Sequence, residues 1–442
     1  MYPSDGWKKT TEAWQSLVHV CRRWRSLVLG SPRRLNLRLF CTPKTPARDT
    51  LDVWPALPLF IASIRDLAPG VENVIAALGQ SNRVRSVMLF AHTNWELEKV
   101  LATMQVSFPE LTNLQLSSFD KTPPAIPDSF LDGSAPRLRE FSLSNIIFPG
   151  LPKLLLSATR LLHLRLTCIP HSGYISPEAM VALLSVLSNL KTFCLGIKSQ
   201  LHPDRSLSPP KRSILPTLKK FIFNGLTEYL EDFVTRIDTP QLDDMRITFF
   251  NQIDFDCPEL IQFIDCTPTL ARDKAYLQFD DAFACVTFPS WRRSLEIGIL
   301  CKVPDQQLSS VVQICDFCLP PPSTVEDLYI ERQLEYLKVV WENAYDTIEN
   351  TLLWLQLLLP FTAVKNLYLS KEFAPIIAAA LQMLVGTGIT EMLPNLQNIF
   401  VGELEASGPF QDNIGQFDAA RRLSDHPITI SVWDKDSSSK SI

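Results

Sequence analysis

Leu111-Thr112-Asn113-Leu114-Gln115-Leu116 is the clearest copy of an apolar pattern, L-x-x-L-x-L, that returns along this 442-residue chain. The last two apolar positions of each copy are two residues apart, so in an extended strand they point to the same side. The residue between them, Gln115 in this copy, points to the other side. Apolar residues take the same positions in eight further copies: Leu138–Phe141–Leu143, Leu161–Leu164–Leu166, Leu190–Phe193–Leu195, Leu218–Phe221–Phe223, Leu242–Met245–Ile247, Val325–Leu328–Ile330, Val364–Leu367–Leu369 and Leu396–Ile399–Val401.

The spacing of these copies predicts a repeat architecture. Consecutive clear copies lie 23 to 29 residues apart, within the period range of leucine-rich repeats. One such unit cannot bury its apolar side alone, so successive units have to stack into a solenoid. The sequence therefore predicts an α/β fold, an irregular leucine-rich-repeat-like solenoid (a horseshoe), with parallel strands on one face and helices on the other. In that fold Leu114, Phe141, Leu164 and Phe193 form one buried column.

The repeats depart from the regular consensus at one position. Regular repeats carry an asparagine three residues after the third apolar position, where its side chain bonds loop backbone. Apolar residues replace that asparagine in this chain, which predicts an irregular solenoid with longer units. The replacing residues are Phe119, Ile146, Ile169, Leu226 and Phe250.

Composition is that of an ordinary globular protein, with 46% hydrophobic and 20% charged residues. Residues 1–14 contain no apolar segment typical of a secretory signal, and the longest apolar run, Leu352–Phe361, is too short to span a bilayer. The ten cysteines are scattered, which favours buried free thiols in a reducing compartment. We therefore expect a cytoplasmic or nuclear protein without a membrane partner.

Charge is unevenly distributed along the chain. Residues 1–50 carry ten Lys or Arg and three Asp or Glu, a net charge of +7, whereas the whole chain has a net charge of −5. This basic segment is compatible with a solvated helix face, with an acidic protein partner or with nucleic acid. Among these partners we expect proteins and no nucleic acid.

The sequence carries no catalytic or cofactor-binding motif. It lacks G-x-x-x-x-G-K-[ST], G-x-S-x-G and H-E-x-x-H, and its six histidines show no ligand spacing. Cys315-x-x-Cys318 is the only close cysteine pair, and no second pair completes the four ligands that zinc needs. We therefore predict no catalytic residue, no cofactor, no metal and no enzymatic activity. An enzyme built on an α/β solenoid is the less favoured alternative.

Residues 12–29 have the apolar spacing of an amphipathic helix, which Gly30-Ser31-Pro32 would end. This helix resembles the second half of an F-box in the segment Trp14-x-x-Leu17-x-x-Val20-Cys21-Arg22-Arg23-Trp24-Arg25-x-Leu27-Val28. The next segment resembles the start of the repeat region in fungal, basidiomycete-type F-box proteins, and it reads Ser31-Pro32-Arg33-Arg34-Leu35-Asn36-Leu37.

The resemblance implies a substrate-recognition subunit of an SCF-type ubiquitin ligase, in which the F-box binds the Skp adaptor and the repeats bind a target protein. The adaptor-binding residues that it implies are Trp14, Leu17, Val20, Trp24 and Val28. F-boxes of this kind open with a Leu-Pro segment and a first helix, and this sequence lacks both ahead of Trp14. We therefore expect a truncated F-box with weak adaptor binding. The alternative is a leucine-rich-repeat recognition protein that acts outside any ubiquitin ligase.

Three segments are predicted from these patterns: a partial F-box helix at 1–32, a solenoid at 33–406 and a C-terminal tail at 407–442. The N-terminal helix is expected to pack back on a first strand, at Leu35, Leu37 and Leu39, as the cap that a solenoid end needs. A further helix is expected at Leu51–Ile64.

The target-binding surface is expected among the residues that lie between the apolar positions, because these point away from the core. Arg and Tyr are enriched in protein interfaces. The predicted surface residues are Gln115, Arg165, Arg246, Tyr329 and Tyr368.

Overall fold

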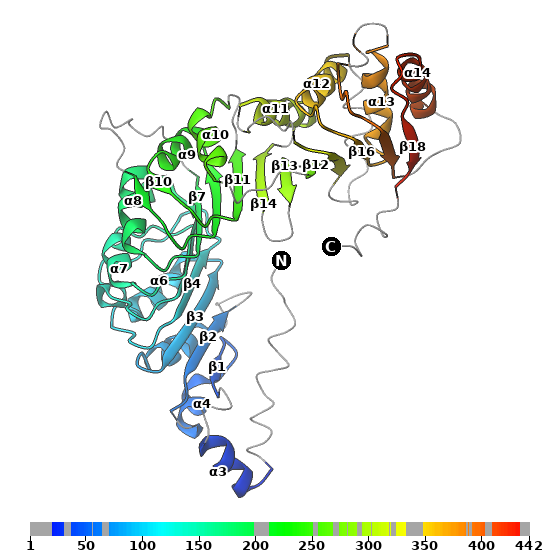
Figure 1. Cartoon of the computed structure of the whole chain (residues 1–442). Helices are drawn as coiled ribbons and strands as arrows, with labels where there is room; N and C mark the ends of the chain where they lie inside the picture. Colours follow the sequence, from blue (N-terminus) through cyan, green and yellow to red (C-terminus); the bar gives the residue numbers. More distant parts are fainter. Residues whose placement is uncertain are drawn as a thin grey trace. The chain divides into compact units, whose positions relative to one another are not determined.

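The fold is seen in a computed structural model (Figure 1). It describes residues 20–30, 37–54, 56–63, 70–198, 212–250, 255–267, 274–280, 282–289, 294–301, 303–317, 319, 324–332, 348–385, 388, 391–402 and 409–433. The chain divides into two compact units, Met1–Ser199 and Gln200–Ile442. Both units alternate strands and helices and are α/β in class, as the repeat pattern predicts.

The described part of the first unit contains seven strands that are hydrogen-bonded in chain order, each parallel to the next. They are β1 (Leu39–Cys41), β2 (Leu59–Ser63), β3 (Val84–Ala91), β4 (Asn113–Ser118), β5 (Glu140–Ser144), β6 (His163–Ile169) and β7 (Thr192–Ile197). The helices are α3 (Arg22–Gly30), α4 (Ala47–Val53), α5 (Val71–Leu78), α6 (Asn94–Thr103), α7 (Leu151–Ser157) and α8 (Pro177–Val186). Figure 1 shows α6, α7 and α8 together on one side of the strands.

The predicted apolar column is confirmed in this unit. Leu114 on β4 is the register partner of Phe141, Phe141 is the partner of Leu164, and Leu164 is the partner of Phe193. All four side chains are at most 1% exposed. Full burial of one such side chain stabilises the fold by about 1.5–3 kcal/mol, so the column contributes much of what holds neighbouring repeats together.

One asparagine, Asn145, bonds loop backbone as the asparagines of regular repeats do. Asn145 directly follows β5 and has φ 56°, a left-handed conformation that asparagine tolerates better than most residues. Its Nδ2 donates to the carbonyl oxygens of Ser118 (3.3 Å) and Asp120 (2.9 Å) in the preceding repeat. The expected loss of an asparagine ladder is therefore incomplete, because this residue bonds loop backbone from one position earlier.

In the described part of the second unit, nine strands lie in the order β9-β11-β14-β13-β12-β15-β16-β17-β18. Their bounds are β9 (Lys220–Gly225), β11 (Asp244–Phe250), β12 (Lys274–Phe279), β13 (Phe283–Pro289), β14 (Ser294–Leu300), β15 (Asp327–Arg332), β16 (Asn366–Leu369), β17 (Asn398–Val401) and β18 (Thr429–Val432). Two short strands, β8 (Ser213–Ile214) and β10 (Ile237–Asp238), form a separate parallel pair.

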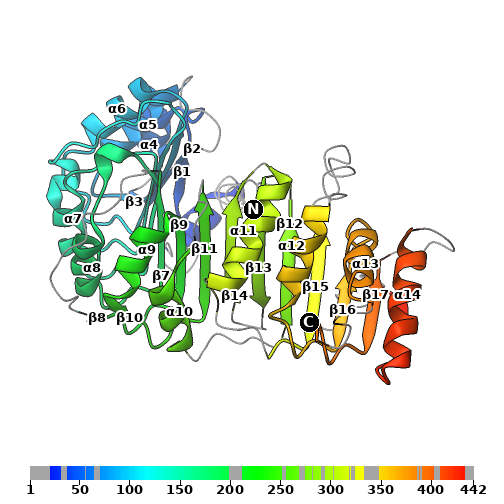
Figure 2. The same ribbon diagram turned by 90° about the horizontal axis from the view of Figure 1, so that it is seen from above.

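The helices of the second unit pack on one face of its strands. They are α9 (Thr227–Val234), α10 (Pro258–Asp265), α11 (Pro304–Phe317), α12 (Ile348–Leu358), α13 (Ala374–Gln382) and α14 (Pro409–Leu423). Figure 2 shows α11, α12, α13 and α14 side by side in front of the strands. The opposite face of these strands therefore carries the side chains that lie between the buried positions.

The second unit departs from a purely parallel arrangement at β12, β13 and β14. These three strands form an antiparallel meander, and their order in the sheet is the reverse of their order in the chain. None of the three strands carries a copy of the L-x-x-L-x-L pattern identified in the sequence. Only residues 280–282 connect β12 to β13, which is too short for the crossover that parallel neighbours need.

Three sequence predictions are corrected by the described residues. The helix expected at Leu51–Ile64 ends with α4 at Val53, and strand β2 follows. The first strand is β1, Leu39–Cys41, so Leu37 precedes it. The C-terminal tail begins with α14 and β18, and β18 pairs in parallel with β17, so the sheet continues beyond the last apolar pattern.

Arg421 on α14 anchors this C-terminal extension. The side chain is fully buried, and its guanidinium donates to the carbonyl oxygens of Leu396 (3.0 Å), Leu393 (3.4 Å) and His426 (3.2 Å). Burial lowers the pKa of Arg421 from its usual value. Because a buried charge is tolerated where its donors are satisfied, these bonds tie α14 to the loop that leads into β17.

Glu231 on α9 joins two neighbouring helices in a similar way. Its carboxylate accepts from the amide N–H groups of Leu260 (2.8 Å) and Glu259 (3.1 Å), in the first turn of α10. The first amides of a helix have no acceptor within the helix. Glu231 therefore supplies the acceptor that α10 lacks, although burial raises the pKa of this carboxyl.

Candidate interaction surface

A single row of outward side chains crosses the strands of the second unit. The pairing registers place one residue of each strand beside one residue of the next, so the row follows directly from the hydrogen bonds. We call it the outward row. In sheet order it consists of Ile222, Arg246, Glu296, Thr287, Tyr276, Tyr329, Tyr368, Phe400 and Ser431.

Four aromatic rings stand next to one another in the half of the outward row nearer to β18. The ring centroids of Tyr276 and Tyr329 are 4.2 Å apart, those of Tyr329 and Tyr368 are 4.2 Å apart, and those of Tyr368 and Phe400 are 4.6 Å apart. Neighbouring rings are within 10° of parallel. We call these four residues the aromatic ladder. The strand separation of about 4.8 Å sets the stacking distance, so the sheet itself holds the rings in place.

Trp433 lies against the aromatic ladder after the end of β18. Its ring centroid is 5.7 Å from that of Tyr329 and 5.4 Å from that of Tyr368. Together with the stacked neighbours, it leaves Tyr329 only 8% exposed. Burial, followed by the influence of the adjacent tyrosines, raises the pKa of Tyr329, and burial also raises the pKa of Tyr276 and Tyr368. The three phenols therefore ionise at a higher pH than free tyrosine does.

A polar ladder runs beside the aromatic one, two residues earlier on the same strands. Lys274 Nζ lies 3.6 Å from Asp327 Oδ2, Asn366 Nδ2 donates to Asp327 Oδ1 at 2.7 Å, and Asn398 Nδ2 donates to Asn366 Oδ1 at 2.8 Å. Ladders of like side chains favour a flat, regular stack of strands. The two ladders therefore fix the side chains of four neighbouring strands in one rigid surface.

The other half of the outward row is charged. Arg246 Nε donates to Asp244 Oδ1 at 3.1 Å, and Lys220 pairs with the second oxygen of the same carboxylate. Burial raises the pKa of Glu296, although Arg246 opposes that shift. One end of the surface thus offers an exposed guanidinium beside two carboxylates, and the other offers stacked rings.

This composition is suited to binding a protein. Tyr, Trp and Arg are the residue types that dominate the energetics of protein interfaces. A preordered row of rings loses little conformational entropy on binding, because the rings are already fixed by their neighbours. The arrangement offers an extended surface with stacked rings in one half and charged side chains in the other.

The sequence prediction located part of this surface. Arg246, Tyr329 and Tyr368 fall on the outward row, although Tyr329 is largely covered. Gln115 and Arg165 lie in the first unit, where they share a different row across β4, β5 and β6, and Arg165 is exposed.

Tyr276, Phe400 and Trp433 were missed. Phe400 stands between Ile399 and Val401, so the same rule would have found it. Tyr276 belongs to a strand without the L-x-x-L-x-L pattern, and Trp433 follows the last copy of that pattern.

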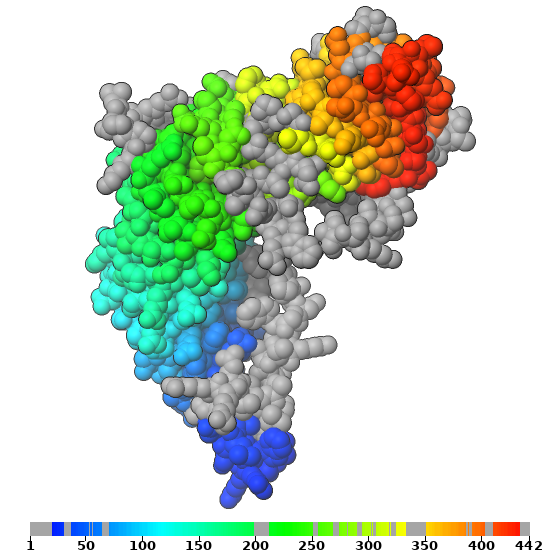
Figure 3. All heavy atoms as spheres, viewed as in Figure 1, coloured from blue at the N-terminus to red at the C-terminus, as the bar shows by residue number. Residues whose placement is uncertain are grey.

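Helix α3 carries the described part of the F-box-like segment, and Figure 3 shows it in dark blue at the surface. Val20, just before the helix, is 65% exposed and Trp24 is 47% exposed, whereas Val28 is 3% exposed. Trp14 and Leu17 lie outside the described residues. Within residues 20–30 Val28 is buried, whereas Cys21 and Trp24 are exposed, contrary to the expectation that the whole apolar stripe is covered.

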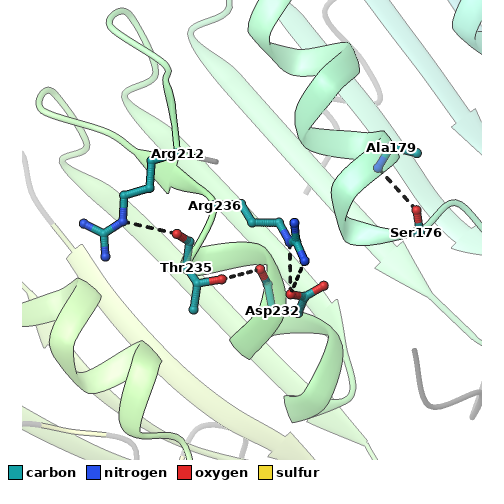
Figure 4. A network of polar contacts seen from close by, with 6 residues as sticks. All are labelled: Ser176, Ala179, Arg212, Asp232, Thr235 and Arg236. Atoms are coloured by element: carbon teal, nitrogen blue, oxygen red, sulfur yellow. Dashed lines mark hydrogen bonds and ion pairs between the residues drawn. The ribbon is translucent and has the colours of Figure 1, made fainter. Parts of the chain in front are cut away.

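Two hollows in the described parts of the chain measure about 60 Å³ and about 20 Å³. The larger one, of about 60 Å³, lies between the end of α9, β10 and α10. Arg212 and Thr235 line it, and Arg212 Nε donates to the carbonyl oxygen of Thr235 at 3.2 Å. Figure 4 shows this bond together with the nearby ion pair of Arg236 with Asp232 at 2.8 Å. Small-molecule sites usually measure roughly 300–1,000 Å³, so this hollow is too small for a cofactor-sized ligand.

Among the described residues, no group of three or more His, Cys, Asp or Glu side chains is placed to hold a metal ion. No helix in these parts of the chain is both long and apolar enough to cross a bilayer.

Comparison of the chain with models of known protein families and with curated proteins gives no match to either.

Proposed function

We propose that this chain is a non-enzymatic recognition scaffold that binds a partner protein along the outward row of its second unit. The observation that carries this proposal is the aromatic ladder with Arg246 in the same row. The rings would form the apolar centre of the interface, and Arg246 with Glu296 would form its charged end. Central aromatic anchors with charged residues at the rim are the usual division of roles in protein interfaces.

A charge-reversal pair tests this proposal. Arg246→Glu changes an exposed arginine of the outward row that pairs with Asp244, and Arg422→Glu changes an exposed arginine of α14 that pairs with Asp418. Affinity capture followed by mass spectrometry should yield a partner that Arg246→Glu loses and Arg422→Glu retains. If both variants captured the partner equally well, the outward row would not be part of the interface.

The finer proposal is that the scaffold serves an SCF-type ubiquitin ligase, with α3 as part of the adaptor-binding element. Support comes from the F-box-like sequence and from the exposure of Val20, Trp24 and Leu27, apolar side chains that an adaptor would cover. In this proposal ubiquitin transfer belongs to the partner proteins, and the chain only presents the target.

Binding to a purified Skp adaptor tests the finer proposal. The chain as given should bind weakly, because residues 1–13 do not match the first half of the F-box pattern. A version extended by a complete first half of the F-box should bind the adaptor tightly. The Trp24→Ala substitution in that version should return the affinity to the weak level of the unextended chain. No binding by the extended version would favour the alternative, a recognition protein outside any ligase, whereas tight binding by the unextended chain would show that the present half suffices.

A further inference from the structure

Positive charge is concentrated where strands β3 to β7 of the first unit begin. Backbone hydrogen bonds place five residues side by side at the starts of these strands: Arg85 on β3, and Thr112, Arg139, Leu162 and Lys191 directly before β4, β5, β6 and β7. The amide N–H of Thr112 donates to the carbonyl oxygen of Arg85 at 2.9 Å. The amide N–H groups of Arg139, Leu162 and Lys191 each donate to the carbonyl oxygen of the preceding member at 2.8 Å. With Arg137 and Arg160, which precede β5 and β6, the row forms what we call the basic edge.

Most of the basic edge has no acidic partner. Glu110 pairs with Arg85 at 3.5 Å and with Arg137 at 2.5 Å, so one carboxylate serves two guanidinium groups. Glu140, the nearest other carboxylate in sequence, accepts from Asn113 Nδ2. In the part of the chain that the structure describes, no ion pair or side-chain hydrogen bond is made by three exposed members of the edge, Arg139, Arg160 and Lys191.

The acidic residues of this unit lie elsewhere. Of the nine Asp and Glu in residues 70–198, only Glu110 and Glu140 adjoin the basic edge. The other seven lie on α5, α6 and α8 or between β4 and β5. A protein with a net charge of −5 therefore keeps a local line of cations, and like charges held close together cost stability unless a counter-charge binds.

We propose that the basic edge is a docking surface for an acidic, extended segment of a partner protein. Neighbouring strands are about 4.8 Å apart, so the line from Arg85 to Lys191 spans about 19 Å. An extended peptide of about six residues covers that length and can place carboxylates opposite the cations. This surface is on the first unit and does not depend on the proposed function of the outward row.

The geometry favours a peptide over nucleic acid. Nucleic-acid affinity comes mainly from many phosphate contacts, whereas the basic edge is a single narrow line with two carboxylates beside it. No member of the basic edge is aromatic, and the ring beside it is a single imidazole, that of His163, whose amide N–H donates to the carbonyl oxygen of Arg139 at 3.0 Å. The edge therefore lacks a series of rings on which successive bases could stack. An acidic peptide, by contrast, needs only a line of cations that can pair with its carboxylates.

Fluorescence anisotropy tests the proposal with the full chain. The probe is a labelled, glutamate-rich peptide of about twelve residues, with its glutamine counterpart as the neutral control, at about 50 mM salt, where surface charges are weakly screened. The edge variant is Arg139→Gln with Lys191→Gln. The matched control is Lys99→Gln with Lys153→Gln, which neutralises two exposed lysines on the helices of the same unit. Thermal unfolding checks that both variants are folded.

The wild-type chain and the control should bind the glutamate peptide alike, and the edge variant should bind it about tenfold more weakly, because two charge pairs are lost. The glutamine peptide should not bind. Three outcomes would each overturn the proposal: no binding of the glutamate peptide, equal weakening in both variants, or tighter binding of a single-stranded oligonucleotide of matched charge.

Discussion

Replacement of Leu164 by alanine tests the stacking of the repeats. Leu164 is fully buried on β6, between Phe141 and Phe193 of the neighbouring strands. The change removes three carbon atoms, which at about 0.8 kcal/mol each is a transfer loss of about 2.4 kcal/mol. The cavity left between two fixed rings adds to that loss, and large-to-small changes of this kind cost about 2–5 kcal/mol in all.

The neighbouring residue supplies the control. Arg165 is exposed on the same strand and has no ion pair within the described residues. Arg165→Ala should therefore change stability by less than about 0.5 kcal/mol. Calorimetry should show the transition of the first unit lowered by about 5–15 °C in Leu164→Ala and nearly unchanged in Arg165→Ala. Equal shifts in the two variants would refute the inward and outward assignment.

Three further predictions concern the second unit. Arg421→Met should destabilise the C-terminal extension by about 2–4 kcal/mol, because the carbonyl groups that the guanidinium bonds are left buried; hydrogen exchange should show α14 losing protection first. Glu231→Ala should cost about 1–2 kcal/mol in a denaturant titration, because two amides of α10 lose their acceptor. Because the pKa values of Tyr276, Tyr329 and Tyr368 are raised, the unfolded chain loses these protons first, so stability should fall as pH rises above about 10. An absorbance titration should show tyrosines that ionise at a higher pH than free tyrosine, and this phase should be absent when Tyr276, Tyr329 and Tyr368 are all replaced by phenylalanine. If the variant still showed that phase, the buried ladder would be contradicted.

Local alternation made the repeat strands predictable. In β4 the side chains of Leu114 and Leu116 are buried and Gln115 lies between them, as the spacing of the pattern requires. Such a strand is encoded by its own residues, because its period of two directs alternate side chains to opposite faces. The parallel order and the helix layer then follow from stacking, so the fold class could be derived from sequence alone.

Features that depend on distant contacts were not predictable in the same way. β13 carries no repeat pattern, and its antiparallel pairing depends on the short link from β12. The first four residues of β2 are all apolar, so the pattern does not distinguish a strand from a buried helix. Pro58 was the signal that could have ended the expected helix earlier.

The candidate surface could be predicted only in part for the same reason. Arg246 and Tyr368 were identified because each stands between two apolar positions of its own strand. Their membership of one row depends on the order β11-β14-β13-β12-β15-β16, which no local pattern specifies. Trp433 joins the surface through packing that starts from the end of β18, so its position required the structure.

Site-specific photo-crosslinking tests the central proposal, that the outward row binds a partner protein, most directly. A photoreactive phenylalanine would replace Arg246 or Tyr368 on the outward row, or Arg422 on α14 as the control, in the full chain. We predict that both row positions become covalently linked to the same partner protein and that the α14 position does not. Crosslinking of that partner from Arg422 alone, with none from either row position, would contradict the account.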